Sequence, residues 1–144
     1  MNYSFIDRDK KDIFAYMVEE SDYDKFLKTV KKIRNKAVKD AVEPIMVLND
    51  ISEVFIIEDG MYTYYYGSKQ KFNLMEKVSI PKYKYFCVEL GDDSEFDYDI
   101  VSAIDLIKAD IENDIEFEDI DIDFSYCIYE KVDEIDKLFF KVKI

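Results

Sequence analysis

The sequence predicts one domain of the α+β class, in which two pseudo-repeated β-α-β-β units share an antiparallel sheet with two long helices and a central cleft. Two segments place apolar residues at three- and four-residue spacing, as amphipathic helices do. Several shorter segments are rich in β-branched and aromatic residues. The order of these segments is similar in the two halves, so residues 1–144 divide into repeat 1 at about 1–70 and repeat 2 at about 71–144.

The first half begins with an expected strand over 3–18, which a polar run at 7–12 interrupts with a turn or bulge. Ser21 precedes Asp24 by three residues, a capping-box pattern that predicts a helix start. Apolar residues then recur at helical spacing as far as Ala41, so an amphipathic helix of about five turns is expected, with its lysines in water.

A tyrosine-rich hairpin follows the helix. The apolar run 54–57 and the tyrosine run are separated by Asp59-Gly60, a strong hairpin signal. Side chains alternate along a strand, so Tyr62, Tyr64 and Tyr66 share one face. Each buried phenol needs a hydrogen-bond partner, so these rings suit the wall of a cleft, with their hydroxyls in water. The alternative is an exposed sheet face of high β-propensity.

The remaining elements follow the same patterns. Strands are expected over 45–48 after Pro44, over 78–90 and over 138–144, and a second helix over 100–111. Between that helix and the closing strand, within the segment 117–129, residues 120–129 alternate between apolar and other side chains. The alternation predicts that these residues share one face of a strand: Ile120, Ile122, Phe124, Tyr126 and Ile128.

The net charge of −13 is spread unevenly. Residues 22–42 hold seven basic and three acidic side chains, a net charge of +4, so the rest of the chain sums to −17. Such a field repels nucleic-acid phosphates and favours cations or basic protein surfaces. We therefore expect no direct nucleic-acid binding.

Composition excludes several further classes. No apolar run approaches the ~18 residues that span a bilayer, and the first residues lack the features of a signal peptide. Two cysteines are too few for a secreted disulfide framework and fit a reduced cytoplasm. Because the sequence has no histidine, it excludes histidine-dependent catalysis and zinc sites that contain histidine. Asp119, Asp121 and Asp123 lack the glycine and closing glutamate of a calcium loop. We expect a cytoplasmic protein with no membrane contact, no cofactor and no metal.

Three motifs carry a family resemblance. Tyr64-Tyr65-Tyr66-Gly67, Ile80-Pro81-Lys82-Tyr83-Lys84-Tyr85-Phe86 and Phe124-Ser125-Tyr126-Cys127-Ile128-Tyr129 occur in the order and spacing of the GyrI-like small-molecule-binding domain, which is also the effector-binding domain of multidrug-responsive transcription regulators. The chain resembles this family over most of its length. The resemblance implies two related β-α-β-β units around a cleft that takes flat, hydrophobic and often cationic molecules.

One position departs from the family pattern. The resemblance implies that the glutamate of the family's Phe-Glu-x-Tyr motif lies in the cleft, where some members use it for hydrolysis. Here Tyr126 matches the aromatic residue, Cys127 stands in the glutamate's place, and Tyr129 matches the tyrosine. The departure disfavours catalysis and requires another acid, such as Glu89, to pair with a cation.

The candidate ligand-binding residues come from these motifs and strands. An alternative to ligand binding exists for two of them. Glu89 can be a surface acid at a strand end, and Cys127 can be a small buried apolar residue. No catalytic residue is nominated. The candidates are Tyr64, Tyr66, Tyr85, Glu89, Cys127 and Tyr129.

The leading functional hypothesis is a non-enzymatic domain that senses or sequesters a small molecule in a tyrosine-lined cleft. The expected ligand is aromatic and hydrophobic, and the class includes cations. An alternative is an acidic inhibitor or DNA mimic that acts on a basic, DNA-handling protein such as gyrase, motivated by the charge of −17 outside the first helix. A further alternative is a hydrolase of the same fold.

Overall fold

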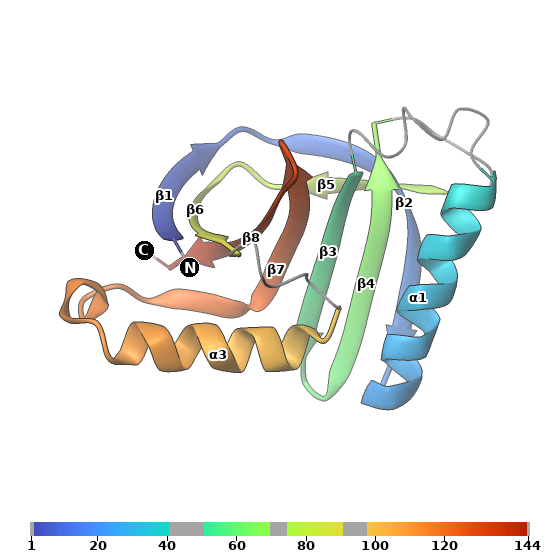
Figure 1. Ribbon diagram of the computed structural model, residues 1–144. Coiled ribbons are helices and arrows are strands. Elements are labelled where there is room, and N and C mark those ends of the chain that lie inside the picture. The colour runs from blue at the N-terminus through green and yellow to red at the C-terminus, as the bar shows by residue number, and fades with distance from the viewer. Residues whose placement is uncertain (1, 41–50, 70–74, 91–97, 144) are drawn as a thin grey trace.

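Eight strands form one curled antiparallel sheet, and two helices pack on the same face of it (Figure 1). The computed structural model describes residues 2–40, 51–69, 75–90 and 98–143. The α+β class and the helix-covered sheet are confirmed. The elements are β1 (Asn2–Arg8), β2 (Lys11–Glu20), α1 (Tyr23–Asp40), β3 (Ile51–Glu58), β4 (Met61–Ser68), β5 (Glu76–Ile80), β6 (Tyr83–Glu89), α3 (Ile100–Glu112), the 3-10 turn η1 (Ile115–Phe117), β7 (Ile122–Val132) and β8 (Ile135–Val142).

The strand order relates the two halves of the chain. Across the sheet it is β1-β6-β8-β7-β3-β4-β2-β5, and exchanging β1–β4 with β5–β8 reproduces the same order read from the other edge. The pair β3 and β7 lies at the centre, so it joins the halves. Each half also gives its first strand to the other, since β1 pairs with β6 and β5 pairs with β2.

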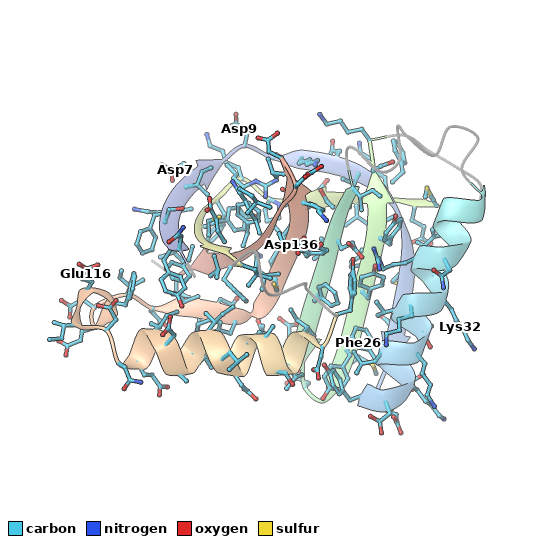
Figure 2. All side chains as sticks on the ribbon, viewed as in Figure 1. Asp7, Asp9, Phe26, Lys32, Glu116 and Asp136 are labelled. Carbon is cyan, nitrogen blue, oxygen red and sulfur yellow. The ribbon has the colours of Figure 1, made fainter. Side chains whose placement is uncertain are left out.

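The two faces of the sheet bury two separate cores. The helix-side core, beneath α1 and α3, includes Phe26, Val30, Phe55, Tyr64, Tyr66, Phe86, Ile100, Ile104, Ile107 and Phe140. The opposite core consists of Ile13, Ala15, Val54, Ile80, Tyr85, Cys87, Ile128 and Phe139. Neighbouring residues of one strand fall into different cores because strand side chains alternate. Figure 2 shows Phe26 pointing from α1 toward the sheet, while Lys32 points away from it.

Both helices begin where a carboxylate accepts a hydrogen bond from the first turn. Asp99 Oδ1 accepts from the Ser102 amide at 3.2 Å at the start of α3. At the start of α1, Asp22 Oδ1 accepts from the Lys25 amide at 3.0 Å. The expected cap at Ser21 is therefore wrong by one residue, because the carboxylate of Asp22 reaches the free amide instead. Neither helix in the described parts of the chain combines the length and apolar character needed to cross a bilayer.

The hairpin between β3 and β4 is confirmed. Asp59 and Gly60 both have positive φ, 51° and 74°, as a tight two-residue hairpin turn requires. The shared face of the three tyrosines is also confirmed, since Tyr64 and Tyr66 lie in the helix-side core and Tyr62 packs against it. The expectation that their hydroxyl groups lie in water is wrong for Tyr64, which is 0% exposed.

The alternation predicted for residues 120–129 is interrupted in the structure. Asp123 pairs with Lys141, but the next ladder pair joins Cys127 to Phe140. Residues 124–126 therefore form a bulge, and an odd number of extra residues reverses the faces of all later side chains. As a result Ile122 lies in the helix-side core, whereas Ile128 lies in the opposite core.

Three other strands expected from the sequence have different outcomes. The strand expected over 78–90 is divided at Pro81 and Lys82 into the end of β5 and the whole of β6, because proline has no amide proton to give to a ladder. The polar interruption in the first strand is confirmed as the break between β1 and β2. The strand expected over 45–48 lies outside the described residues.

Candidate functional site

A buried carboxylate lies at the centre of the helix-side face. The side chain of Glu53, on β3, is only 4% exposed. Tyr64 donates a hydrogen bond to Glu53 Oε1 from the neighbouring strand β4. The hydroxyl of Tyr98 donates to Glu53 Oε2 at 3.3 Å from the start of α3. Each carboxylate oxygen therefore has a phenol partner, which lowers the cost of burying the charge.

An arginine from α1 completes the contacts of this carboxylate. Arg34 Nε lies 3.3 Å from Glu53 Oε1, and the guanidinium carbon lies 4.0 Å from the centre of the Tyr98 ring. Arg34 thus makes both an ion pair and a cation–π contact. The ion pair is not well aligned, because the buried Nε finds no acceptor in hydrogen-bond geometry among the described residues.

Strand register explains why tyrosines flank the carboxylate. Glu53 is directly opposite Tyr66 on β4 and directly opposite Tyr129 on β7. Residues opposite one another in adjacent strands point to the same face. A row of Tyr66, Glu53 and Tyr129 therefore crosses the centre of the sheet, and it joins the two halves of the chain.

Tyr98 is held in a strained backbone conformation beside this row. Its φ is 69°, a left-handed value that aromatic residues rarely adopt. The Tyr98 ring meets the Tyr129 ring edge to face, with centroids 5.6 Å apart and planes at 83°. The Tyr129 hydroxyl donates to Asp136 Oδ1 at 2.6 Å, so the second ring of this corner is also fixed. Strain of this kind is concentrated at functional sites.

These side chains surround a small cavity of about 110 Å³. It takes its lining from α1, from the strands β3, β4 and β7, and from Tyr98, two residues before α3. The lining residues are Arg34, Ile51, Glu53, Tyr66, Tyr98, Tyr129 and Lys131. The cavity therefore has a carboxylate, a phenol-rich wall and two cationic side chains.

Burial changes the protonation of the site. Burial raises the pKa of Glu53 from its ordinary value of 4.5 to about 7, against the opposing effects of Arg34 and of the hydrogen bonds from Tyr64 and Tyr98. Burial and the nearby Glu53 carboxylate raise the pKa of Tyr66 to about 12. The tyrosine is therefore a neutral donor near pH 7, while Glu53 exchanges its proton there.

Three of the six residues nominated from the sequence meet at this site. Tyr66 and Tyr129 line the cavity, and Tyr64 holds Glu53 from beneath it. The other three lie elsewhere in the structure. Their ligand-binding role stays a prediction.

Tyr85, Glu89 and Cys127 lie outside the lining of the cavity. Tyr85 belongs to the opposite core and donates to the Pro81 carbonyl at 2.7 Å. Glu89 forms an ion pair with Lys137 at 3.5 Å. Cys127 is on the helix-side face, but it is only 1% exposed and burial raises the pKa of its thiol. A buried neutral thiol takes no part in pairing with a cation.

Three residues of the site were not predicted from the sequence: Glu53, Arg34 and Tyr98. One signal for Glu53 was present, because it has the same parity as Phe55 in a strand with an apolar run, and a carboxylate on a core face needs a partner. Arg34 resembled the other basic residues of α1, and Tyr98 follows a stretch without periodicity. No sequence signal identified these two.

Two larger hollows, of about 410 and 430 Å³, lie beside α3. Both include Lys108, whose Nζ lies 5.2 Å from the centre of the Phe124 ring. Neither has a buried carboxylate in its lining, since Asp105, Glu112, Glu118 and Asp121 are exposed and Asp114 is half-buried. A third hollow, of about 720 Å³, is lined by the exposed carboxylates Asp7 and Asp9. Of these four hollows in the described part of the chain, the small cavity around Glu53 is the one with a buried carboxylate in its lining.

Solved structures share this fold. A candidate bacterial transcription regulation protein from Staphylococcus aureus MU50 matches with a TM-score of 0.71 and 12% identity over 100% of this chain and 99% of its own. The protein SAV2435, solved with tetraphenylphosphonium bound, matches with a TM-score of 0.70 and 12% identity over 99% and 94%. An integron cassette protein from the mobile metagenome of Vibrio cholerae matches with a TM-score of 0.68 and 8% identity over 98% and 95%.

The sequence comparisons add no family. No protein-family model matches the chain, and no curated protein matches it significantly. At 12% identity or less, the likeness to the solved structures shows a common fold.

Proposed function

We propose that this protein is a non-enzymatic small-molecule-binding protein that senses or sequesters an aromatic, hydrophobic cation at the site around Glu53. The observation that carries the proposal is a buried carboxylate that is surrounded by tyrosines and already contacts a cationic group, Arg34. A cation over a desolvated tyrosine ring gains about 0.5–2 kcal/mol, and the carboxylate adds charge pairing in the same place.

The position of the acid supports this proposal. The family resemblance implies an acid in the cleft, and Cys127 stands in its expected place on β7. Glu53 lies on the adjacent strand β3, opposite Tyr129 in the ladder. The Glu53 carboxylate therefore lies on the same face of the sheet as the motif position. It can form an ion pair with a cationic ligand in place of the motif glutamate.

The shared fold also supports it. SAV2435, which has this fold, was solved with tetraphenylphosphonium, a cation with four aromatic rings. We extend to this chain only the chemical class of that ligand, an aromatic cation, because the lining residues named above match that class.

We also propose that the two halves are structural repeats, about 1–70 and 71–144, with the site at their junction. The strand order, which is unchanged when the halves are exchanged, supports this proposal. The site takes Arg34, Glu53 and Tyr66 from the first half and Tyr98 and Tyr129 from the second. Ligand sites commonly lie at such junctions.

Fluorescence polarisation with rhodamine 6G, a planar aromatic cation, tests the function at about pH 8. Wild type is expected to bind the dye, and Glu53→Gln is expected to lose at least tenfold in affinity because it removes the charge and keeps the shape. Tyr66→Ala is expected to lose binding as well, through the lost ring. Glu58→Gln removes an identical charge from an exposed side chain at the end of the same strand as Glu53, outside the lining of the cavity, so it is the matched control and keeps wild-type affinity.

Two results would contradict the proposed function. One is the absence of saturable binding by wild type. The other is equal affinity in wild type, Glu53→Gln and Tyr66→Ala, which would place the dye elsewhere on this acidic protein.

A further inference from the structure

Arg34 occupies the place in which the proposed function puts a guest cation. Its guanidinium lies over the Tyr98 ring at 4.0 Å, and its Nε lies 3.3 Å from the Glu53 carboxylate. These are the same two contacts that an aromatic-site cation would make. An external cation therefore cannot reach Glu53 and the Tyr98 face while Arg34 remains there.

The contact of Arg34 is suited to displacement. The arginine side chain is 39% exposed, whereas that of Glu53 is 4% exposed. Arg34 Nε is buried without an aligned acceptor in the described residues, so leaving the site lets this group regain hydrogen bonds to water. The helix itself is held by Phe26 and Val30, both 0% exposed. The side chain can therefore turn into solvent while α1 stays in place.

The size of the cavity also indicates that Arg34 must leave the site before a ligand can bind. With Arg34 in place the cavity is about 110 Å³, well below the roughly 300–1,000 Å³ of pockets for drug-sized ligands. The guanidinium forms part of its lining, so its departure would enlarge the space over Tyr98 and expose the carboxylate to the guest.

The geometry of the carboxylate limits the class of guest. Tyr64 donates to Oε1 and Tyr98 donates to Oε2, and each oxygen can accept a further bond. A flat platform is provided by the Tyr98 face, with the Tyr129 ring nearly perpendicular beside it. A planar cation with N–H donors can stack on the platform and donate to the carboxylate. A quaternary cation can only stack.

We infer that Arg34 is an internal competitor for this site and that its guests are planar aromatic amidinium or guanidinium cations, which displace Arg34 by reproducing its two contacts. The inference rests on the proposed function and names the ligand class of that site.

The test compares three one-ring probes by isothermal titration calorimetry at about pH 9, where Glu53 is ionised. Benzamidine is a planar cation with N–H donors, benzyltrimethylammonium is an aromatic cation without them, and benzoate is an anion of similar size. The variants are Arg34→Met, which removes the competitor and keeps a long apolar side chain, and Lys32→Met. Lys32 is an exposed residue of the same helix that points away from the sheet (Figure 2), so its substitution removes the same charge.

Wild type is expected to bind benzamidine more tightly than benzyltrimethylammonium. Arg34→Met is expected to bind benzamidine at least tenfold more tightly than wild type, and Lys32→Met less than twofold differently. Circular dichroism checks the fold of each variant. If Arg34→Met does not fold, Arg34→Gln replaces it, because glutamine removes the charge and still donates a hydrogen bond. The same tightening is expected for this variant.

Two results would overturn the inference. In the first, benzamidine binds Arg34→Met or Arg34→Gln no more tightly than it binds wild type. In the second, wild type prefers benzoate and loses it in Arg34→Met, which would make Arg34 a direct ligand for anions.

Failure of the inference can be told apart from failure of the proposed function. If benzamidine or rhodamine 6G binds wild type and is lost in Glu53→Gln, but Arg34→Met leaves the affinity unchanged, only the inference fails. If none of the cations binds wild type or the Arg34 variants, the proposed function fails with it.

Discussion

Glu53 and Tyr129 lie directly opposite one another across the β3–β7 pair, the ladder that joins the two halves of the chain. The acid of the site therefore comes from one half and an aromatic wall residue from the other. A shift of this register by one residue would move one of the two to the opposite face. The β3–β7 ladder is thus both the centre of the sheet and the determinant of the site.

Cation binding should depend on pH around neutrality. The pKa of Glu53 is about 7, and only the ionised carboxylate pairs with a cation, so the apparent affinity follows the ionised fraction. We expect rhodamine 6G affinity to rise by up to about tenfold between pH 6 and 8. Polarisation titrations across this range measure it. In Glu53→Gln the residual affinity should be flat, and a wild-type profile equally flat would refute the role of this carboxylate.

The free energy of unfolding should also depend on the ionisation of Glu53, but in the opposite direction to cation binding: it should fall as pH rises. The pKa of Glu53 is higher in the folded protein, about 7, than its ordinary value of 4.5, so the folded state holds the proton more strongly. Its stabilising contribution is complete below pH 4.5 and is lost as pH rises through 7. The loss is on the order of 3 kcal/mol.

Urea unfolding of wild type and Glu53→Gln between pH 4 and 8 measures this loss. The difference between the two free energies of unfolding should change over that interval in favour of the variant as pH rises. A constant difference would show that the pKa of Glu53 is not raised in the folded protein.

Gly67 should tolerate no side chain. A Cβ at this position would lie 2.5 Å from the Phe14 carbonyl oxygen and 2.8 Å from the Ala15 Cβ, both on the paired strand β2. Gly67→Ala must therefore push β2 and β4 apart, and we expect a loss of about 2–3 kcal/mol in the free energy of unfolding. Denaturant unfolding measures it.

Gly60→Ala provides the comparison. Its Cβ would meet nothing within 4 Å, but its φ of 74° is left-handed, which costs a residue with a side chain about 1–2 kcal/mol. Equal and negligible effects of both substitutions would contradict the close approach of β2 and β4 at Gly67.

A second buried carboxylate, Glu130, should be structural. Its oxygens lie 3.0 Å from Arg8 and 3.2 Å from Lys11, and Ser52 donates to it at 2.5 Å. Burial raises the pKa of Glu130, but the hydrogen bonds of Arg8 and Ser52 and the charges of Arg8 and Lys11 together outweigh burial and lower the pKa overall. This stabilisation is therefore present above pH 4.5 and is lost as pH falls.

Removing one partner of this cluster should be costly. Arg8→Met leaves the Glu130 charge partly uncompensated, and we expect a loss of about 3 kcal/mol at pH 7. Thermal and urea unfolding measure it. Lys10→Met removes a cation from an exposed pair with Asp12 at 3.7 Å and should change stability by less than about 0.5 kcal/mol. The double variant Arg8→Met, Glu130→Gln should recover part of the loss; a further loss would contradict the pairing.

Local patterns in the sequence were sufficient for much of the fold. Helical spacing predicted both helices, and Asp59-Gly60 between two β-rich runs predicted the hairpin with Tyr64 and Tyr66 on one face. These features depend on interactions within a few residues, so the sequence contains their physical cause. The bulge at residues 124–126 has no such local cause, because it arises from the pairing of β7 with β8.

The site divides in the same way. The sequence by itself determined that tyrosines with a common parity face one side of the sheet, since strand geometry fixes that relation. Only the tertiary structure decided that Glu53 is the acid among them and that Arg34 and Tyr98 meet above it. The reason is that Arg34, Glu53 and Tyr98 are far apart in the chain. They are brought together by ladder register and helix packing, which are set by long-range burial of apolar surface that no local pattern records.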